Sequence, residues 1–81
     1  MTKEQLKQEI LHVFESRNSR PNDIIMMRYW RFTFLPKLNP REQDLFTPAV
    51  NELIDEGKLI YEKESLECLR LTERGYEELY Q

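Results

Sequence analysis

Basic and aromatic side chains are interleaved in one stretch of this sequence, between Arg17 and Arg41, where Asp23 is the only acidic residue. The other basic residues of the stretch are Arg20, Arg28, Arg31 and Lys37, and its aromatic residues are Tyr29, Trp30, Phe32 and Phe34. Arginine and lysine pair with phosphates and aromatic rings stack on bases, so this composition suits the binding of single-stranded nucleic acid. The alternatives are that the rings form the core with the basic residues as its solvated rim, or that surplus apolar surface meets a partner or a dimer mate.

Charge is divided unequally between the two halves of the chain. Residues 1–40 carry seven Lys and Arg against four Asp and Glu, whereas residues 41–81 carry five against eleven. Phosphate binding depends on basic side chains that displace counterions from the nucleic acid. The acidic second half therefore argues against strong phosphate binding and favours contact with a basic protein.

Residues suited to catalysis or metal binding are few. His12 is the only histidine and Cys68 the only cysteine, so no internal disulfide and no cysteine cluster for a metal can form. Glu52, Asp55 and Glu56 are interpreted as a solvated acidic helix face rather than as paired catalytic carboxylates. The sequence predicts a protein that is not an enzyme and that needs no metal or other cofactor.

The length and composition predict one small domain over residues 1–81. Hydrophobic residues make up 40% and charged residues 33%, which is ordinary for a globular chain with one modest core. No apolar run approaches the length of a membrane span, and the N-terminus lacks the pattern of a signal peptide. We therefore expect a cytoplasmic protein without a membrane partner.

A helix is predicted from about residue 39 to residue 56. Its apolar residues follow a 3.6-residue period: Leu45, Phe46, Ala49, Val50, Leu53 and Ile54. Asn39 and Glu42 form a capping box at its start, and Gly57 suits the left-handed residue that ends a helix. Pro48 lies within the stripe, so either the helix kinks there or Thr47 caps a fresh helix.

A hairpin and a last helix are predicted after Gly57. Residues 59–61 and 68–71 are short β-prone runs around a polar tip, and Leu69 and Leu71 should share one face of the second strand. Thr72 can cap the final helix.

The first half is less clear. Thr2 and Gln5 make a capping box for a helix from about residue 3 to 16, and residues 16–22 form a loop by composition. Residues 24–38 fit either a helix or a strand; we favour mostly helix after a very short strand. Leu35 precedes Pro36, which predicts that the helix ends there.

This order of elements resembles the winged helix-turn-helix regulators of the MarR and PadR type. The matching residues are Ala49, Leu53, Glu56, Gly57, Leu59, Ile60, Leu71, Thr72, Gly75 and Leu79. Residues 46–50 (FTPAV) also resemble the entry into the recognition helix of the PadR group. The resemblance implies an α+β winged helix-turn-helix domain with a three-helix core, a β-hairpin wing and a short C-terminal helix.

The resemblance also implies a DNA-binding, transcription-regulator-like module whose partner is double-stranded DNA. In such a domain the recognition helix enters the major groove, and the wing touches phosphate or the minor groove. The expected DNA-binding residues are Arg28, Arg31, Lys37, Arg41, Gln43, Thr47, Asn51 and Lys63. The alternative is a module that binds a protein partner or forms a homodimer without binding DNA. It would use its acidic helix and wing, or its aromatic middle segment through Tyr29, Trp30 and Phe32.

Overall fold

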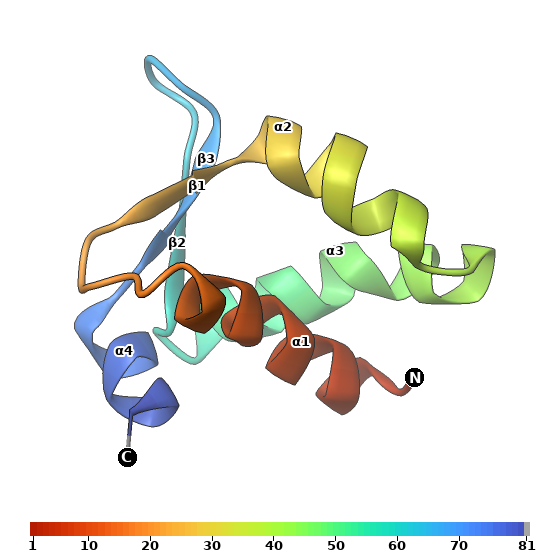
Figure 1. The fold of residues 1–81 in the computed structure, drawn as a ribbon, viewed down its shortest axis with the longest axis horizontal. Coiled ribbons are helices and arrows are strands. Elements are labelled where there is room, and N and C mark those ends of the chain that lie inside the picture. The colour runs from red at the N-terminus through yellow and green to blue at the C-terminus, as the bar shows by residue number, and fades with distance from the viewer. Residues whose placement is uncertain (81) are drawn as a thin grey trace.

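The structure, a computed structural model, describes residues 1–80 as a three-stranded antiparallel sheet with helices packed against it (Figure 1). Helix α1 (Lys3–Ser16) leads to strand β1 (Ile24–Met26) and then to a helical segment made of α2 (Met27–Tyr29), the π-helical turn η1 (Trp30–Phe34) and the 3-10 turn η2 (Leu35–Lys37). Helix α3 (Pro40–Asp55), strands β2 (Leu59–Glu62) and β3 (Cys68–Leu71) and helix α4 (Glu73–Leu79) follow. The expected α+β class is confirmed.

The helix ends lie where the local sequence signals predict them. Thr2 and Asn39 begin α1 and α3 with complete capping boxes, in which side chain and backbone satisfy each other's donors. Gly57 follows α3 with φ of +77°, a left-handed conformation that glycine adopts without steric cost. Thr72 caps α4 by accepting a hydrogen bond from the Gly75 N–H.

Strand β3 lies at the centre of the sheet, because the strand order is β1-β3-β2. Leu69 is opposite Ile25 on one side and Tyr61 on the other, and Leu71 is opposite Leu59. All of these aliphatic side chains are buried, so the expectation that Leu69 and Leu71 share a face is confirmed.

The stretch that the sequence left open between helix and strand contains both. Strand β1 is only three residues long and the helical segment follows it directly. This agrees with the prediction of mostly helix after a very short strand. The predicted end at Leu35 is wrong, because Leu35 keeps helical angles (φ −58°, ψ −40°) and the turn continues to Lys37. A single 3-10 turn tolerates Pro36 near its start, where no N–H donor is needed. The Gln43 side chain then donates to the carbonyls of Leu35 and Leu38 at 3.0 and 3.1 Å.

The core is centred on Trp30, whose side chain has no exposed surface. Its ring centroid lies 6.0 Å from that of Phe14 on α1, 5.1 Å from Phe34 on η1 and 5.9 Å from Phe46 on α3. One indole therefore packs against rings from α1, η1 and α3. Aromatic pairs at these separations stabilise the fold beyond the effect of their buried area.

Helix α3 continues through Pro48 as one helix, so the alternative in which Thr47 caps a fresh helix is wrong. The proline lacks the N–H that would bond to the carbonyl of Asp44 one turn earlier. Pro48 is exposed, which lets water reach that part of the helix.

Helix α4 packs closely against the turn that follows α3. A Cβ atom at Gly75 would overlap the carbonyl oxygen of Lys58 and the side chain of Leu71, so only glycine fits there. Tyr76 and Leu79 are half-buried and pack against the core. The C-terminal helix thus closes one end of the domain.

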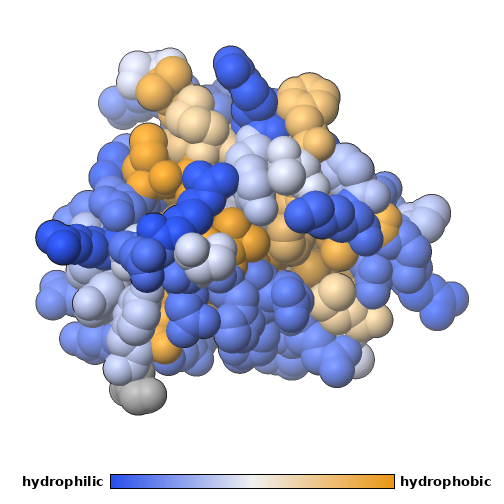
Figure 2. Space-filling model, viewed as in Figure 1, coloured by the Kyte–Doolittle hydropathy of each residue, from blue (hydrophilic) through white to orange (hydrophobic). Residues whose placement is uncertain are grey.

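The surface is mostly polar, with apolar atoms reaching it over the sheet and near the middle of the face shown in Figure 2. Large apolar side chains that stay exposed include Ile24, Phe32, Ile60, Tyr61 and Leu66. Within residues 1–80, no helix combines the length and apolarity that crossing a bilayer requires.

Candidate nucleic-acid interface

The side of α3 opposite the core carries short polar residues. Phe46, Ala49, Val50 and Leu53 are buried, and the helical period turns Thr47 and Asn51 to solvent. Arg41 is exposed in the first turn of the same helix. Hydroxyl and amide side chains at such positions hydrogen-bond to base edges, and arginine binds phosphate or guanine.

A groove of about 260 Å³ separates α3 from the β2–β3 hairpin and the start of α2. Its lining residues are Met27, Phe46, Thr47, Val50, Asn51, Tyr61, Glu67 and Leu69. Thr47 and Asn51 thus lie on one wall of this groove, and Tyr61 and Glu67 of the hairpin lie on the other.

Arg31 connects the helical segment to the hairpin beside this groove, through a residue of its lining, Glu67. Its guanidinium forms an ion pair with the carboxylate of Glu67, which also accepts a hydrogen bond from the Tyr61 hydroxyl. These hydrogen bonds, from Tyr61 first and then from Arg31, hold the pKa of Glu67 below its usual range. The Arg31 side chain is 53% exposed, so it is paired but still reachable from solvent.

The other expected DNA-binding residues fall into two groups. Arg28, Lys37, Arg41 and Lys63 are exposed, and none of them forms an ion pair among the first eighty residues. Gln43 is exposed too, but its amide donates to the carbonyls of Leu35, the first residue of η2, and Leu38, which follows η2. Its position gives it a structural task, which the sequence did not indicate.

The three aromatic residues expected to bind a partner are separated by the fold. Trp30 lies in the core and offers no surface to a partner, because a helix at this place buries the residue that faces α1 and α3. Tyr29 is half-buried against Trp30, and the Arg17 guanidinium covers its ring at 4.4 Å from the centroid. Phe32 points away from the core and is 74% exposed.

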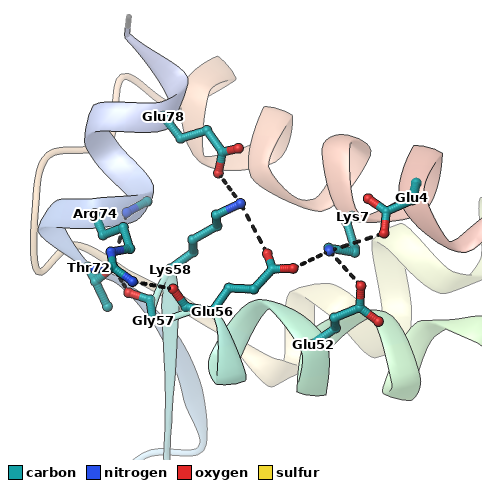
Figure 3. Close-up of polar contacts among 10 residues, drawn as sticks. Glu4, Lys7, Glu52, Glu56, Gly57, Lys58, Thr72, Arg74 and Glu78 are labelled. Atoms are coloured by element: carbon teal, nitrogen blue, oxygen red, sulfur yellow. Dashed lines mark hydrogen bonds and ion pairs between the residues drawn. The ribbon is translucent and has the colours of Figure 1, made fainter.

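The acidic residues of α3 do not form the single solvated face that the sequence predicts. Glu52 and Glu56 turn toward α1, where the Lys7 ammonium lies 2.8 and 2.7 Å from their carboxylate oxygens (Figure 3). Lys3 is a second partner of Glu52 at 2.7 Å. Asp55 is exposed and forms no ion pair within the described residues.

Lys7 is the residue that sequence reasoning missed. Its side chain is 5% exposed, and it follows Leu6 in the buried stripe of α1 that continues through Ile10, Leu11 and Phe14. Burial by itself lowers the pKa of Lys7, but hydrogen bonds to Glu52, Glu56 and Glu4 together outweigh it and raise this pKa. A lysine inside an apolar stripe was the available signal, since a buried cation needs carboxylate partners.

The same network continues to α4. Lys58 bridges Glu56 at 3.0 Å and Glu78 at 2.5 Å, and Arg74 donates to the backbone carbonyl of Glu56 at 3.1 Å (Figure 3). The acidic charge near the end of α3 is thereby matched by cations of α1 and of the following turn. Asp44 and Asp55 are left as the exposed acids on the outer side of α3.

No group of three His, Cys, Asp or Glu side chains in residues 1–80 is arranged to hold a metal ion. Cys68 is buried on β3, and this burial raises the pKa of its thiol.

Comparison with models of known protein families, with curated proteins and with solved structures gave no match.

Proposed function

We propose that this chain is a winged helix-turn-helix module that binds duplex DNA through the outer side of α3, with the hairpin as its wing. The order α1–β1–α2–α3–β2–β3 is the order expected of such a domain. The observation that carries the proposal is the direction of the α3 side chains. Thr47 and Asn51 face outward beside the hairpin, whereas Glu52 and Glu56 turn inward to Lys7.

In this proposal α3 enters the major groove, where Thr47 and Asn51 reach base edges. Phosphates are contacted by the exposed cations around it, which are Arg28, Lys37 and Arg41. Asp44 and Asp55 share the outer side of α3, and their negative charges repel the phosphate backbone of the DNA. The affinity is therefore modest and strongly dependent on salt, since it rests on a few phosphate contacts.

Fluorescence anisotropy of a labelled duplex, titrated at several salt concentrations, tests this function. Arg41→Ala should weaken binding to every sequence and reduce the slope of log K against log salt by about 0.9, the loss of one phosphate contact. Asn51→Ala should weaken mainly the preferred sequence, and Asp44→Asn should strengthen binding because it removes a like charge. The matched control is Arg20→Ala in the loop between α1 and β1, on the opposite side of Figure 1 from the start of α3.

Arg20→Ala should leave the affinity nearly unchanged. Absence of duplex binding by the wild-type protein, even at low ionic strength, would contradict DNA binding.

A second candidate function is self-association through the segment between β1 and α3. Phe32 has the highest exposed fraction, 74%, among the large apolar side chains of residues 1–80, and such a ring is a suitable anchor in an interface. Sedimentation at several protein concentrations should then reveal a dimer that Phe32→Ala returns to monomer. A wild-type protein that stays monomeric at every concentration argues against this candidate.

A further inference from the structure

Glu67 lies where the hairpin, the helical segment and the groove beside α3 meet. We propose that Glu67 withholds Arg31 from nucleic acid, so that Arg31 contacts a phosphate only when the phosphate displaces the carboxylate. This role rests on the proposed DNA-binding function and deepens it. In this role the hairpin weakens phosphate binding through Glu67, in addition to serving as the wing.

The Arg31–Glu67 contact follows from the way the hairpin joins the helical segment. The Met27 N–H donates to the backbone carbonyl of Glu67 at 3.0 Å, which fixes Glu67 at the start of α2. Arg31 comes four residues after Met27 and so lies on the same side of the helical segment, one turn further on. The carbonyl of Glu67 therefore binds the first turn and its carboxylate binds the next.

The carboxylate is held in its charged form. The hydroxyl of Tyr61, on the neighbouring strand β2, donates a hydrogen bond to one carboxylate oxygen, and the Arg31 guanidinium donates a hydrogen bond to the other. The hydrogen bond to Glu67 raises the pKa of Tyr61, so the phenol remains a donor at neutral pH. Arg31 is in consequence neutralised by a fixed anion in the unbound protein.

The location of this pair connects it to DNA. Glu67 lines the same groove as Thr47 and Asn51, the proposed base-contacting residues of α3. A phosphate close enough to use Arg31 would also lie close to the Glu67 carboxylate and be repelled by it. Among the cations proposed for this surface, Arg28, Lys37 and Arg41 have no carboxylate partner in the described part of the chain.

The consequence is a measurable gain on removing one acid. Glu67→Gln deletes the negative charge and frees the guanidinium, whereas the backbone bond to Met27 remains. Duplex affinity should rise by about three- to tenfold. The slope of log K against log salt should steepen by about 0.9, the gain of one phosphate contact. Glu64→Gln at the exposed hairpin tip removes the same charge without freeing an arginine, so it should change the affinity less than about twofold.

Anisotropy titrations of a labelled duplex with Glu67→Gln, Glu64→Gln, Arg31→Ala and the double variant Arg31→Ala/Glu67→Gln test the role of Glu67, with circular dichroism confirming that each variant is folded. The expected result is a gain in duplex affinity for Glu67→Gln over the wild type. In the Arg31→Ala background, the gain from Glu67→Gln should fall to the level seen for Glu64→Gln. Equal effects of Glu67→Gln and Glu64→Gln, a gain that persists without Arg31, or weaker binding by Glu67→Gln would each overturn this role while leaving DNA binding intact. Absence of binding by the wild-type protein and by all of the variants would overturn both the DNA-binding function and this role.

Discussion

Replacing Trp30 by alanine should lower the free energy of unfolding by about 3–5 kcal/mol, the range for removing a large aromatic side chain from a core. Trp30 has no exposed surface, and rings from α1, η1 and α3 surround it. Its loss would leave a cavity that these helices share. The cost should therefore be larger than that of an average core substitution.

Phe32→Ala is the matched control, since it removes an aromatic ring two residues away on the same turn. Phe32 is 74% exposed, so this change should alter the free energy of unfolding by less than about 0.5 kcal/mol. Urea unfolding followed by far-ultraviolet circular dichroism measures both variants without relying on tryptophan fluorescence. Because Trp30→Ala can unfold a small domain altogether, Trp30→Phe gives an intermediate point and should cost less. Equal costs for Trp30→Ala and Phe32→Ala would contradict the burial of Trp30.

These two residues also show why the middle of the chain was hard to read from its sequence. Residues 24–38 have apolar side chains on both sides of a helix, so periodicity does not reveal which side meets the core. The side that faces the core depends on contacts with residues distant in sequence, Phe14 on α1 and Phe46 on α3, which only the tertiary fold brings next to Trp30. Sequence reasoning therefore predicted the helix but grouped Trp30 with Phe32.

Elements with local signals were predicted well for the opposite reason. Capping boxes at Thr2 and Asn39, the left-handed Gly57 and the Thr72 cap each depend on residues within one turn of chain. The exposed positions of Thr47 and Asn51 follow from the helical period alone. The ion pairs Lys7–Glu56 and Arg31–Glu67 join residues 49 and 36 positions apart, and no local rule indicates such partners.

Replacing Lys7 by methionine should lower the free energy of unfolding by about 1.5–3 kcal/mol near neutral pH, the range for losing hydrogen bonds to charged groups. The methionine keeps most of the buried stem but leaves Glu52 and Glu56 without their shared cation. Each of these carboxylates is about one third exposed and can regain water, so the cost stays below that of a fully buried pair. Lys3→Met is the control: Lys3 also pairs with Glu52 but is 42% exposed, and its loss should cost less than about 0.5 kcal/mol.

The difference between Lys7→Met and the wild type should shrink in acid. Hydrogen bonds from Lys3 and then Lys7 lower the pKa of Glu52 from 4.5 to about 2, and Lys7 and then Lys58 lower that of Glu56. A carboxyl group whose pKa is lowered by folding stabilises the protein above its unfolded value, and this contribution is lost as the pH falls toward the folded value. The wild type should therefore lose stability as the pH falls below about 5, and Lys7→Met should lose less because part of the pairing is already gone. On the alkaline side the sign is opposite, since the raised pKa of Lys7 keeps its contribution until the pH exceeds the ordinary lysine value.

Urea unfolding at about pH 7 and about pH 3 measures this difference for Lys7→Met and for Lys3→Met. A cost for Lys7→Met that is the same at both pH values would contradict a stabilising role of the ion pairs, because it would show that the stabilisation does not depend on the ionised Glu52 and Glu56 carboxylates. A cost that falls in acid assigns the stabilisation to the ion pairs. Those pairs also hold Glu52 and Glu56 on the side of α3 that faces α1, so the same network that stabilises the domain leaves Thr47 and Asn51 beside fewer negative charges.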